Sequence, residues 1–201
     1  MKRYYILGAG GLGRELCHWL ADGNCTCAGF IDDNPHALDA YHGYPPIVGD
    51  TDSAPLDLPI LCGIGQNILR INAVERLKAR GAVFASFIHP AAKVLPCVLG
   101  EGAVVAPFAY IGADATLGDF LFLQTGGVIG HDVCAGHFLR MDTTAFIGGF
   151  AKLGDAVTLH TGAKVMPGKS VGESCTIGAG SVVIANLRAG QTVFGVPAQK
   201  L

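Results

Sequence analysis

The sequence predicts two structural units, an α/β unit over residues 1–86 and a solenoid of stacked parallel strands over residues 87–201. Two observations lead to this division. In the first unit, the glycine-rich stretch GAGGLG separates an apolar segment from a segment with helical spacing. In the second unit, an aliphatic residue followed by glycine recurs every six residues. A short fixed period of this kind is the sequence signature of a repeat architecture.

The first unit has the pattern of a Rossmann-like βαβαβ arrangement. Residues 3–34 follow the order strand, glycine turn, helix, strand, and residues 58–81 follow the order strand, helix. Gly10 and Gly11 stand at the start of the first helix, where backbone N–H groups bind phosphate. Directly after the second strand come Asp32 and Asp33, at a position from which a carboxylate can reach ribose hydroxyls. We therefore expect a nucleotide site in this unit.

Two other interpretations of the glycine turn remain open at this point. GAGGLG matches the pattern G-x-G-x-x-G, which favours an NAD-dependent dehydrogenase, although the unit has only about half the length of a full dinucleotide fold. Alternatively, the glycines only allow a tight turn between strand and helix.

The second unit shows sixteen consecutive blocks of six residues, which begin at Leu99. The first position is Leu, Ile, Val or Met in fourteen blocks, with Ala135 and Ala189 as exceptions, and the second position is Gly in ten. Three blocks make a coil of eighteen residues, in which inward aliphatic residues stack on their equivalents in neighbouring coils. Lys169 stands where a small inward residue is expected, which suggests a local change of phase.

The eighteen-residue coil predicts which side chains lie above one another. His131 and Gly149 belong to one column, and Asp132 directly follows His131 in the sequence. An imidazole is suited to remove a proton near neutral pH, and a carboxylate beside it fixes its orientation. A second column contains Thr125, Thr143, Thr161, Ala179 and Pro197.

Composition excludes several classes of protein. No apolar run reaches the roughly 20 residues that cross a bilayer, and the N-terminus lacks a secretory signal, so we expect a cytoplasmic protein without a membrane anchor. The lysines and arginines are scattered and the formal charge is −2, which argues against nucleic acid as a partner. The seven cysteines have no metal-site spacing, so no metal is expected. Half of the residues are apolar, which predicts an oligomer.

The order of motifs resembles a known family. GAGGLG, FIDD, GIGQNILR, IHPAA, IGHD and the terminal GVPAQKL are similar to the motifs of bacterial sugar acetyltransferases of the sialic-acid O-acetyltransferase and bacillosamine-pathway N-acetyltransferase family. The resemblance covers nearly the whole chain. It implies a left-handed parallel β-helix, a homotrimer with active sites at subunit interfaces, and acetyl-CoA as co-substrate. It also implies that the first unit binds the acceptor, often a nucleotide-linked amino sugar.

The resemblance assigns roles to individual residues. His131 becomes the catalytic base, Asp132 the acidic neighbour that raises its basicity, and Gly149 the residue whose N–H faces the thioester carbonyl. His137 and His160 are expected to be structural or surface residues. The other residues implied to contact acetyl-CoA are Arg140, Thr161, Ala179, Gly195 and Pro197. The residues implied to bind the acceptor are Gly10, Gly11, Leu12, Asp32, Asp33, Gln66 and Asn67.

Two departures from the family pattern affect the substrate rather than the chemistry. Leu12 and Arg140 stand where other members often have histidine. The sequence therefore predicts N-acetylation of a nucleotide-linked amino sugar for a surface glycan, with the sugar and nucleotide left open. O-acetylation of a sugar hydroxyl, an acyl donor other than acetyl-CoA, and a non-catalytic repeat scaffold are the alternatives.

Overall fold

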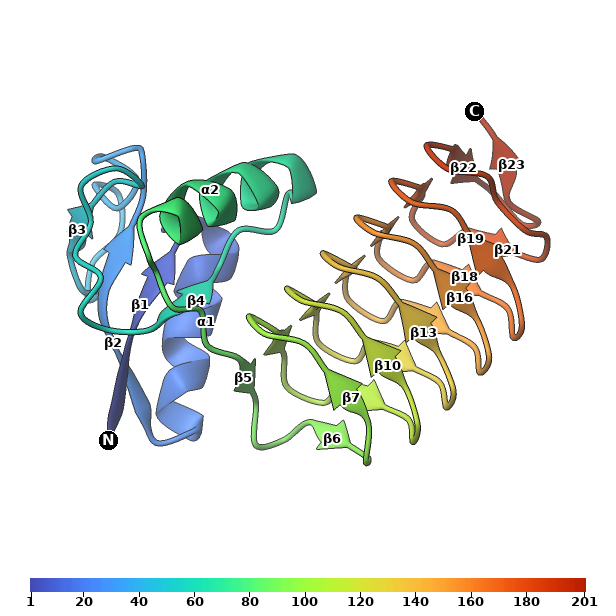
Figure 1. The fold of residues 1–201 in the computed structure, drawn as a ribbon, viewed down its shortest axis with the longest axis horizontal. Coiled ribbons are helices and arrows are strands. Elements are labelled where there is room, and N and C mark those ends of the chain that lie inside the picture. The colour runs from blue at the N-terminus through green and yellow to red at the C-terminus, as the bar shows by residue number, and fades with distance from the viewer. The chain divides into compact units, whose positions relative to one another are not determined.

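The computed structural model describes residues 1–201, which form two compact units, Met1–His89 and Pro90–Leu201 (Figure 1). The sequence placed the boundary after residue 86, and the structure places it after His89. No helix of either unit has the length and apolar character needed to cross a membrane.

Unit 1 is a parallel sheet with two helices. Its sheet contains β1 (Lys2–Leu7), β2 (Cys25–Ile31), β3 (Ile47–Gly49) and β4 (Ile60–Cys62), and its helices are α1 (Gly11–Asp22) and α2 (Asn67–Ala79). The short β5 (Phe87–Ile88) follows within the residues of this unit but is not part of the sheet. The first four strands lie in the order β3-β2-β1-β4 and pair in parallel. An isolated parallel bridge from Ile60 to Phe84 extends the sheet after α2.

The predicted strand and helix order is confirmed, with one addition. The chain between β2 and β4 contains turns and the edge strand β3 instead of a helix, and the sequence analysis did not predict β3. The core of the unit consists of the central strands and the inner face of α1, where Ile6, Phe30, Leu16 and Leu20 are fully buried. This packing leaves the carboxyl ends of the parallel strands free to form a site.

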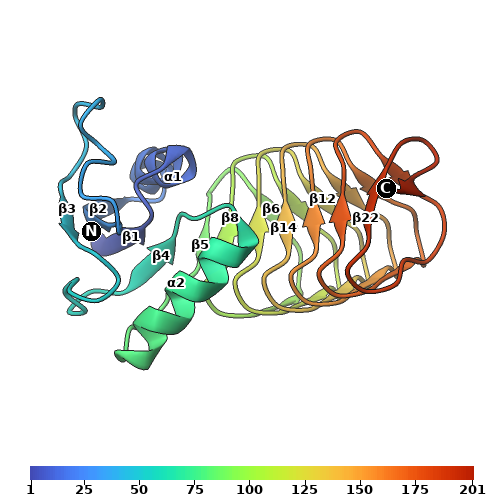
Figure 2. The same ribbon diagram turned by 90° about the horizontal axis from the view of Figure 1, so that it is seen from above.

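Unit 2 is a solenoid whose coils stack one behind another (Figure 2). Side 1 contains β6 (Lys93–Val94), β9 (Tyr110–Ile111), β12 (Val128–Ile129), β15 (Phe146–Ile147), β18 (Lys164–Val165) and β21 (Val182–Val183). Side 2 contains β7 (Val98–Leu99), β10 (Thr116–Leu117), β13 (Cys134–Ala135), β16 (Lys152–Leu153) and β19 (Ser170–Val171). Side 3 contains β8 (Val104–Val105), β11 (Phe122–Leu123), β14 (Arg140–Met141), β17 (Thr158–Leu159), β20 (Thr176–Ile177), β22 (Thr192–Phe194) and β23 (Gln199–Lys200).

The six-residue pattern explains the core of this solenoid. Aliphatic residues at the first block position, such as Ile129, Ile147 and Val165, are completely buried and stack from coil to coil. The expected change of phase at Lys169 is wrong. Its carbonyl accepts the N–H of Lys152 and the strand pairing continues unchanged, because only the half-buried side chain departs from the pattern.

The last coil departs from the predicted register. Val171 bridges Leu187 and Ile177 pairs with Val193, so this coil has sixteen residues where the others have eighteen. The shortening removes Ala189 from the first-position column of the core. It also moves Pro197 out of the predicted column, because Gly195 is the residue sixteen positions after Ala179. Chain-terminal strand β23 then turns back antiparallel to β22.

Candidate active site

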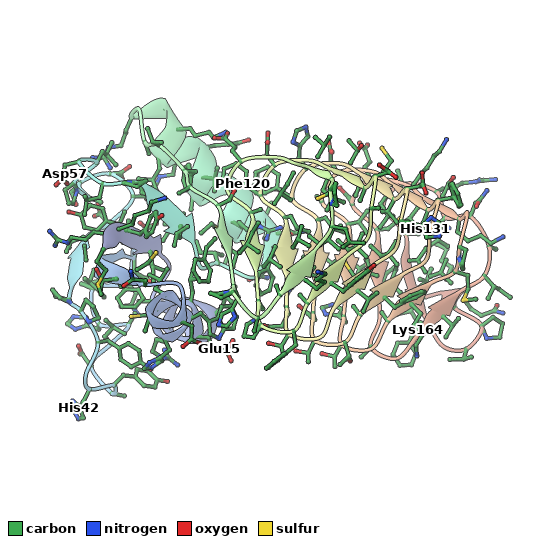
Figure 3. The ribbon with its side chains drawn as sticks, turned by 90° about the horizontal axis from the view of Figure 1, so that it is seen from below. Glu15, His42, Asp57, Phe120, His131 and Lys164 are labelled. Atoms are coloured by element: carbon green, nitrogen blue, oxygen red, sulfur yellow. The ribbon has the colours of Figure 1, made fainter.

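His131 and Asp132 lie at the corner between side 1 and side 2, and Figure 3 labels His131 on the solenoid. The ring Nδ1 of His131 is 2.7 Å from Oδ2 of Asp132. An ionised carboxylate only accepts hydrogen bonds, so a neutral imidazole in this pair carries its proton on Nδ1. The other nitrogen, Nε2, is then an unprotonated base. The side chain of His131 is 59% exposed, so a substrate can reach this nitrogen.

Gly149 lies directly under the imidazole ring, one coil further along. A Cβ atom at this position would come within 2.7 Å of both Cε1 and Nε2 of His131. The Gly149 N–H has no acceptor within the chain, whereas the neighbouring N–H groups of Gly148 and Phe150 donate to Val165 and His131 carbonyls. The corner thus combines a base with an unused backbone donor. This contact follows from the eighteen-residue coil that the sequence predicts.

The residues expected to contact acetyl-CoA fall on another part of the solenoid. Thr161 and Ala179 are exposed at the corner between side 3 and side 1, in adjacent coils. Side 1 therefore separates them from His131 within one chain. Gly195 lies in the terminal segment, where its N–H donates to Oγ of the buried Ser181, and the neighbouring Pro197 is exposed.

Arg140 is already paired within the chain. Its Nε donates to Oδ1 of Asp142 at 2.7 Å, and its Nη2 to Oδ2 at 3.2 Å. The same carboxylate contacts Nδ1 of His160 at 2.9 Å. Arg140 and His160 therefore share one partner, which the sequence analysis did not predict. No group of three or more His, Cys, Asp or Glu side chains in the chain is arranged to hold a metal ion.

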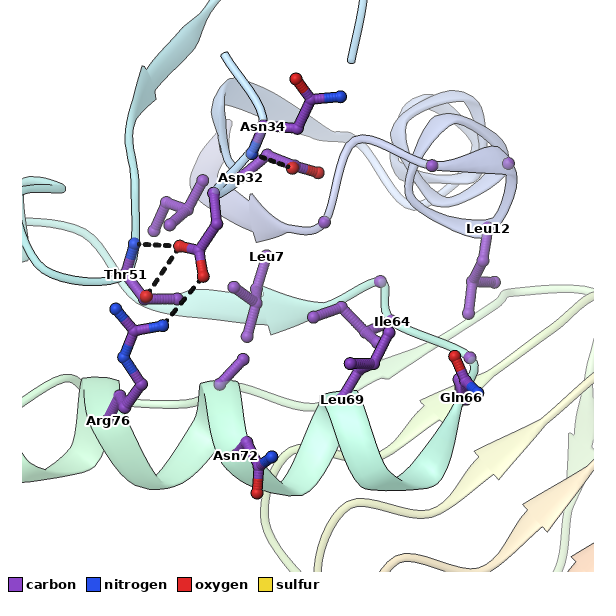
Figure 4. Close-up of a pocket in the computed structure, with 18 residues that line it drawn as sticks. Leu7, Leu12, Asp32, Asn34, Thr51, Ile64, Gln66, Leu69, Asn72 and Arg76 are labelled. Carbon is purple, nitrogen blue, oxygen red and sulfur yellow. Dashed lines mark hydrogen bonds and ion pairs between the residues drawn. The ribbon is translucent and has the colours of Figure 1, made fainter. Parts of the chain in front are cut away.

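Unit 1 contains a separate pocket of about 760 Å³ at the carboxyl ends of β1, β2 and β4 (Figure 4). Of the seven residues expected to bind the acceptor, six line this pocket: Gly10, Gly11, Leu12, Asp32, Asp33 and Gln66. Asn67 does not line it. Its side-chain oxygen accepts a hydrogen bond from Nη2 of Arg70 within α2.

The two aspartates of the pocket have different surroundings. Asp32 accepts the N–H of Ala9 at 2.7 Å, so its carboxylate braces the glycine turn. Asp33 accepts the N–H and hydroxyl of Thr51 and an N–H of Arg76. Burial raises the pKa of the Asp33 carboxyl, but these contacts outweigh burial and hold the pKa below its ordinary value. Asp33 is therefore a fixed anion at neutral pH.

Two comparisons place the chain among known proteins. A family model described as the PglD N-terminal domain matches residues 3–77. PerB from Caulobacter crescentus, solved with CoA and GDP-perosamine, is 30% identical with a TM-score of 0.90, over 100% of this chain and 97% of that chain. The chain belongs to the PglD-like family of hexapeptide-repeat sugar acetyltransferases.

A second solved structure agrees with this assignment. The acetyltransferase domain of PglB from Neisseria gonorrhoeae FA1090, in complex with acetyl coenzyme A, is 27% identical with a TM-score of 0.88, over 100% of this chain and 99% of that chain. No curated protein sequence matches the chain. Membership of the PglD-like family confirms the predicted left-handed β-helix after an α/β unit. It also removes the dehydrogenase alternative, because the family match covers the GAGGLG turn.

The structure of this family member adds pocket residues that the sequence analysis missed. Thr51 precedes β4 by a long loop, and nothing in its local sequence connects it to Asp33. By contrast, α2 contributes Leu69, Asn72, Ala73 and Arg76, which share the spacing of one helical face. That spacing is visible in the sequence, so it could have identified these α2 residues as one face of the pocket.

Proposed function

We propose that this chain transfers the acetyl group of acetyl-CoA to the amine of a nucleotide-linked amino sugar in surface glycan synthesis. The observation that carries the proposal is the His131–Asp132 pair held over Gly149, in a family whose member perosamine N-acetyltransferase was solved with CoA and GDP-perosamine. Dependence on acetyl-CoA and a nucleotide sugar supports a cytoplasmic location.

The proposed reaction uses both groups at the corner. Nε2 of His131 accepts a proton as the acceptor amine attacks the thioester carbon. The Gly149 N–H donates to the oxyanion that forms on the thioester oxygen. When the tetrahedral intermediate collapses, the carbon–sulfur bond breaks and the imidazolium returns a proton to the departing thiolate. Asp132 keeps the proton on Nδ1 and stabilises the imidazolium.

The proposed acceptor site is the pocket of unit 1. The N–H groups that begin α1 lie beside Gly10 and Gly11 and favour an anion, which suits the diphosphate of a nucleotide sugar. Hydroxyl and amide groups of the nucleoside find acceptors and donors in Asp33, Gln66 and Asn72. Leu12 gives this pocket an apolar wall at a position where the family often has histidine, so we expect a less polar sugar substituent there.

Two glycines of the GAGGLG turn test packing and ligand binding separately, because Gly11 lines the pocket and Gly13 does not. A Cβ at Gly13 would collide with the carbonyl oxygen of Gly8, whereas a Cβ at Gly11 meets no atom within 4 Å. We expect Gly13→Ala to destabilise the fold by about 1–3 kcal/mol. Gly11→Ala should keep the melting temperature but weaken nucleotide binding, because the methyl group stands where phosphate would approach. Thermal unfolding and calorimetric titration with nucleoside diphosphates measure both effects. Unchanged nucleotide affinity in Gly11→Ala would argue that the turn does not contact phosphate.

Asp132 provides a second test of the proposed chemistry. Asp132→Asn removes the negative charge while keeping the size of the side chain, so the imidazolium loses its charge partner, and an amide NH2 can favour the wrong tautomer by donating to Nδ1. We expect kcat to fall by about tenfold or more with little change in KM for acetyl-CoA. Steady-state kinetics check this, and an unchanged kcat would show that Asp132 only shapes the corner.

We further propose a homotrimer with the active site between subunits. The columns of His131 and Thr161 lie at opposite edges of side 1, so one chain does not bring them together. A neighbouring copy packed along side 1 would supply the second column. The apolar side chains of Tyr110, Val128 and Phe146 on the outer positions of this side support such packing.

Two acceptors that differ in one group test the reaction type. A nucleotide-linked amino sugar and its hydroxyl analogue are incubated with acetyl-CoA, and the products are identified by mass spectrometry. We expect acetylation of the amine alone. Equal acetylation of the hydroxyl analogue would favour the O-acetyltransferase alternative. Binding of acetyl-CoA without transfer to any acceptor would favour the non-catalytic scaffold.

A further inference from the structure

Phe150 has an unusual position next to the candidate base. It follows Gly149 at the same corner and adopts a left-handed backbone conformation with φ of 61°. Its ring centroid lies 5.0 Å from that of His131, with the two planes at 87°. The residue is nevertheless 60% exposed. A large aromatic side chain is thus held against the imidazole but covered by little else in the chain.

The fold itself does not require phenylalanine here. The equivalent corner positions in neighbouring coils are Asp114, Asp132 and Gly168, which also have positive φ and are residue types that tolerate this conformation. A bulky side chain in this region costs conformational energy, and an exposed one recovers little of it by burial. A residue of this kind next to an active site points to a functional role.

Two other phenylalanines with positive φ, Phe120 and Phe138, have a structural reason for this conformation. Phe120 and Phe138 stack on each other with centroids 5.0 Å apart and planes at 7°, and Phe120 is only 2% exposed. The burial of Phe120 and the stacking of the two rings compensate for the backbone conformation. Phe150 has no stacking partner of this kind, because its ring contact is with His131.

We propose that Phe150 is a specificity-determining residue that forms one wall of the acyl subsite and restricts the donor to acetyl-CoA. The inference rests on the proposed function. The thioester carbon must lie within reach of the Gly149 N–H and of an acceptor amine that contacts His131. Because Phe150 follows Gly149 and contacts the same imidazole, the acyl substituent on that side meets the phenyl ring. A methyl group fits beside the ring, whereas a longer chain displaces it.

The test compares acyl donors of different length. Wild type and Phe150→Ala are assayed for thiol release with acetyl-CoA, propionyl-CoA and butyryl-CoA, using an acceptor that the wild type acetylates. We expect the ratio of kcat/KM for butyryl-CoA to that for acetyl-CoA to rise by about 10- to 100-fold in Phe150→Ala, since added methylene groups in a tight pocket change rates by this order. An unchanged ratio would overturn the inference.

Phe108 is a matched control. It is also phenylalanine, has φ of 61° and is 72% exposed, but it lies at the corner between side 3 and side 1, three coils before Thr161. Phe108→Ala should leave the donor ratio unchanged, and an equal rise in this variant would contradict a local role for Phe150. Wild-type enzyme that uses butyryl-CoA as well as acetyl-CoA would also overturn the inference. Absence of any acetyl transfer by the wild type would instead refute the proposed function.

Discussion

His131→Ala is expected to lower kcat by roughly 100- to 10,000-fold, the usual contribution of a positioned general base. The variant removes Nε2, the nitrogen left unprotonated by the 2.7 Å contact of Nδ1 with Asp132. Acetyl-CoA binding and thermal stability should change little, because the side chain is more than half exposed and belongs to a surface corner. Steady-state kinetics, calorimetric titration with CoA and thermal unfolding measure the three quantities.

His137 offers a control of the same residue type and similar exposure, but its Nδ1 accepts the backbone N–H of Asp119 at 3.1 Å, so a neutral ring carries its proton on Nε2. It occupies the same block position in the next six residues, its Nδ1 lies 3.2 Å from Oδ2 of Asp119, and its side chain is 52% exposed. His137 lies at a different corner, between side 2 and side 3. His137→Ala should therefore retain kcat within about twofold. Equal losses in the two variants would mean that the effect comes from the fold and not from general-base chemistry.

Gly149→Ala is expected to lower kcat by about 100-fold with little loss of stability. The new methyl group would lie 2.7 Å from Cε1 and Nε2 of His131, so the ring must move. This movement is easy for an exposed side chain, but a displacement of about 1 Å at a catalytic group is enough for such a rate loss. Because the variant keeps the backbone N–H of residue 149, a loss of kcat would report the displaced imidazole and not the loss of the backbone donor.

The double variant His131→Ala/Gly149→Ala tests this explanation. If the methyl group acts by displacing the imidazole, it should cost nothing further once the imidazole is absent. A full additional loss in the double variant would contradict the explanation. Gly148→Ala gives a structural contrast, since its Cβ would lie 2.6 Å from the backbone nitrogen of Pro167. We expect this variant to lose stability, in contrast to Gly149→Ala.

The architecture of unit 2 was largely predictable because the aliphatic residues that recur every six positions are also the buried residues. Each coil repeats the same inward positions, so aliphatic residues such as Ile129 and Ile147 identify the core directly. The two-residue shortening of the last coil was not predictable. Val183 and Ala189 keep the six-residue spacing, and only the pairings of Val171 with Leu187 and of Ile177 with Val193 show that the coil is shorter.

In the candidate site, too, contacts between segments that are distant in the sequence could not be predicted. His131 and Asp132 are sequence neighbours, and the coil length places Gly149 beneath them, so this constellation could be derived. The pairing of Asp33 with Thr51 and Arg76 depends on how three separate segments meet. The ring contact of Phe150 with His131 depends on a left-handed conformation that phenylalanine seldom adopts. Neither contact follows from spacing or composition.

The central claim is that the chain acetylates a nucleotide-linked amino sugar. The most direct measurement is thiol release from acetyl-CoA by the wild-type protein in the presence of UDP-, dTDP-, GDP- and CMP-linked amino sugars. We predict thiol release that depends on the acceptor and reaches its highest kcat/KM with the amino sugars of a single nucleotide. Thiol release that does not depend on any of these acceptors, or none at all despite bound acetyl-CoA, would contradict the claim.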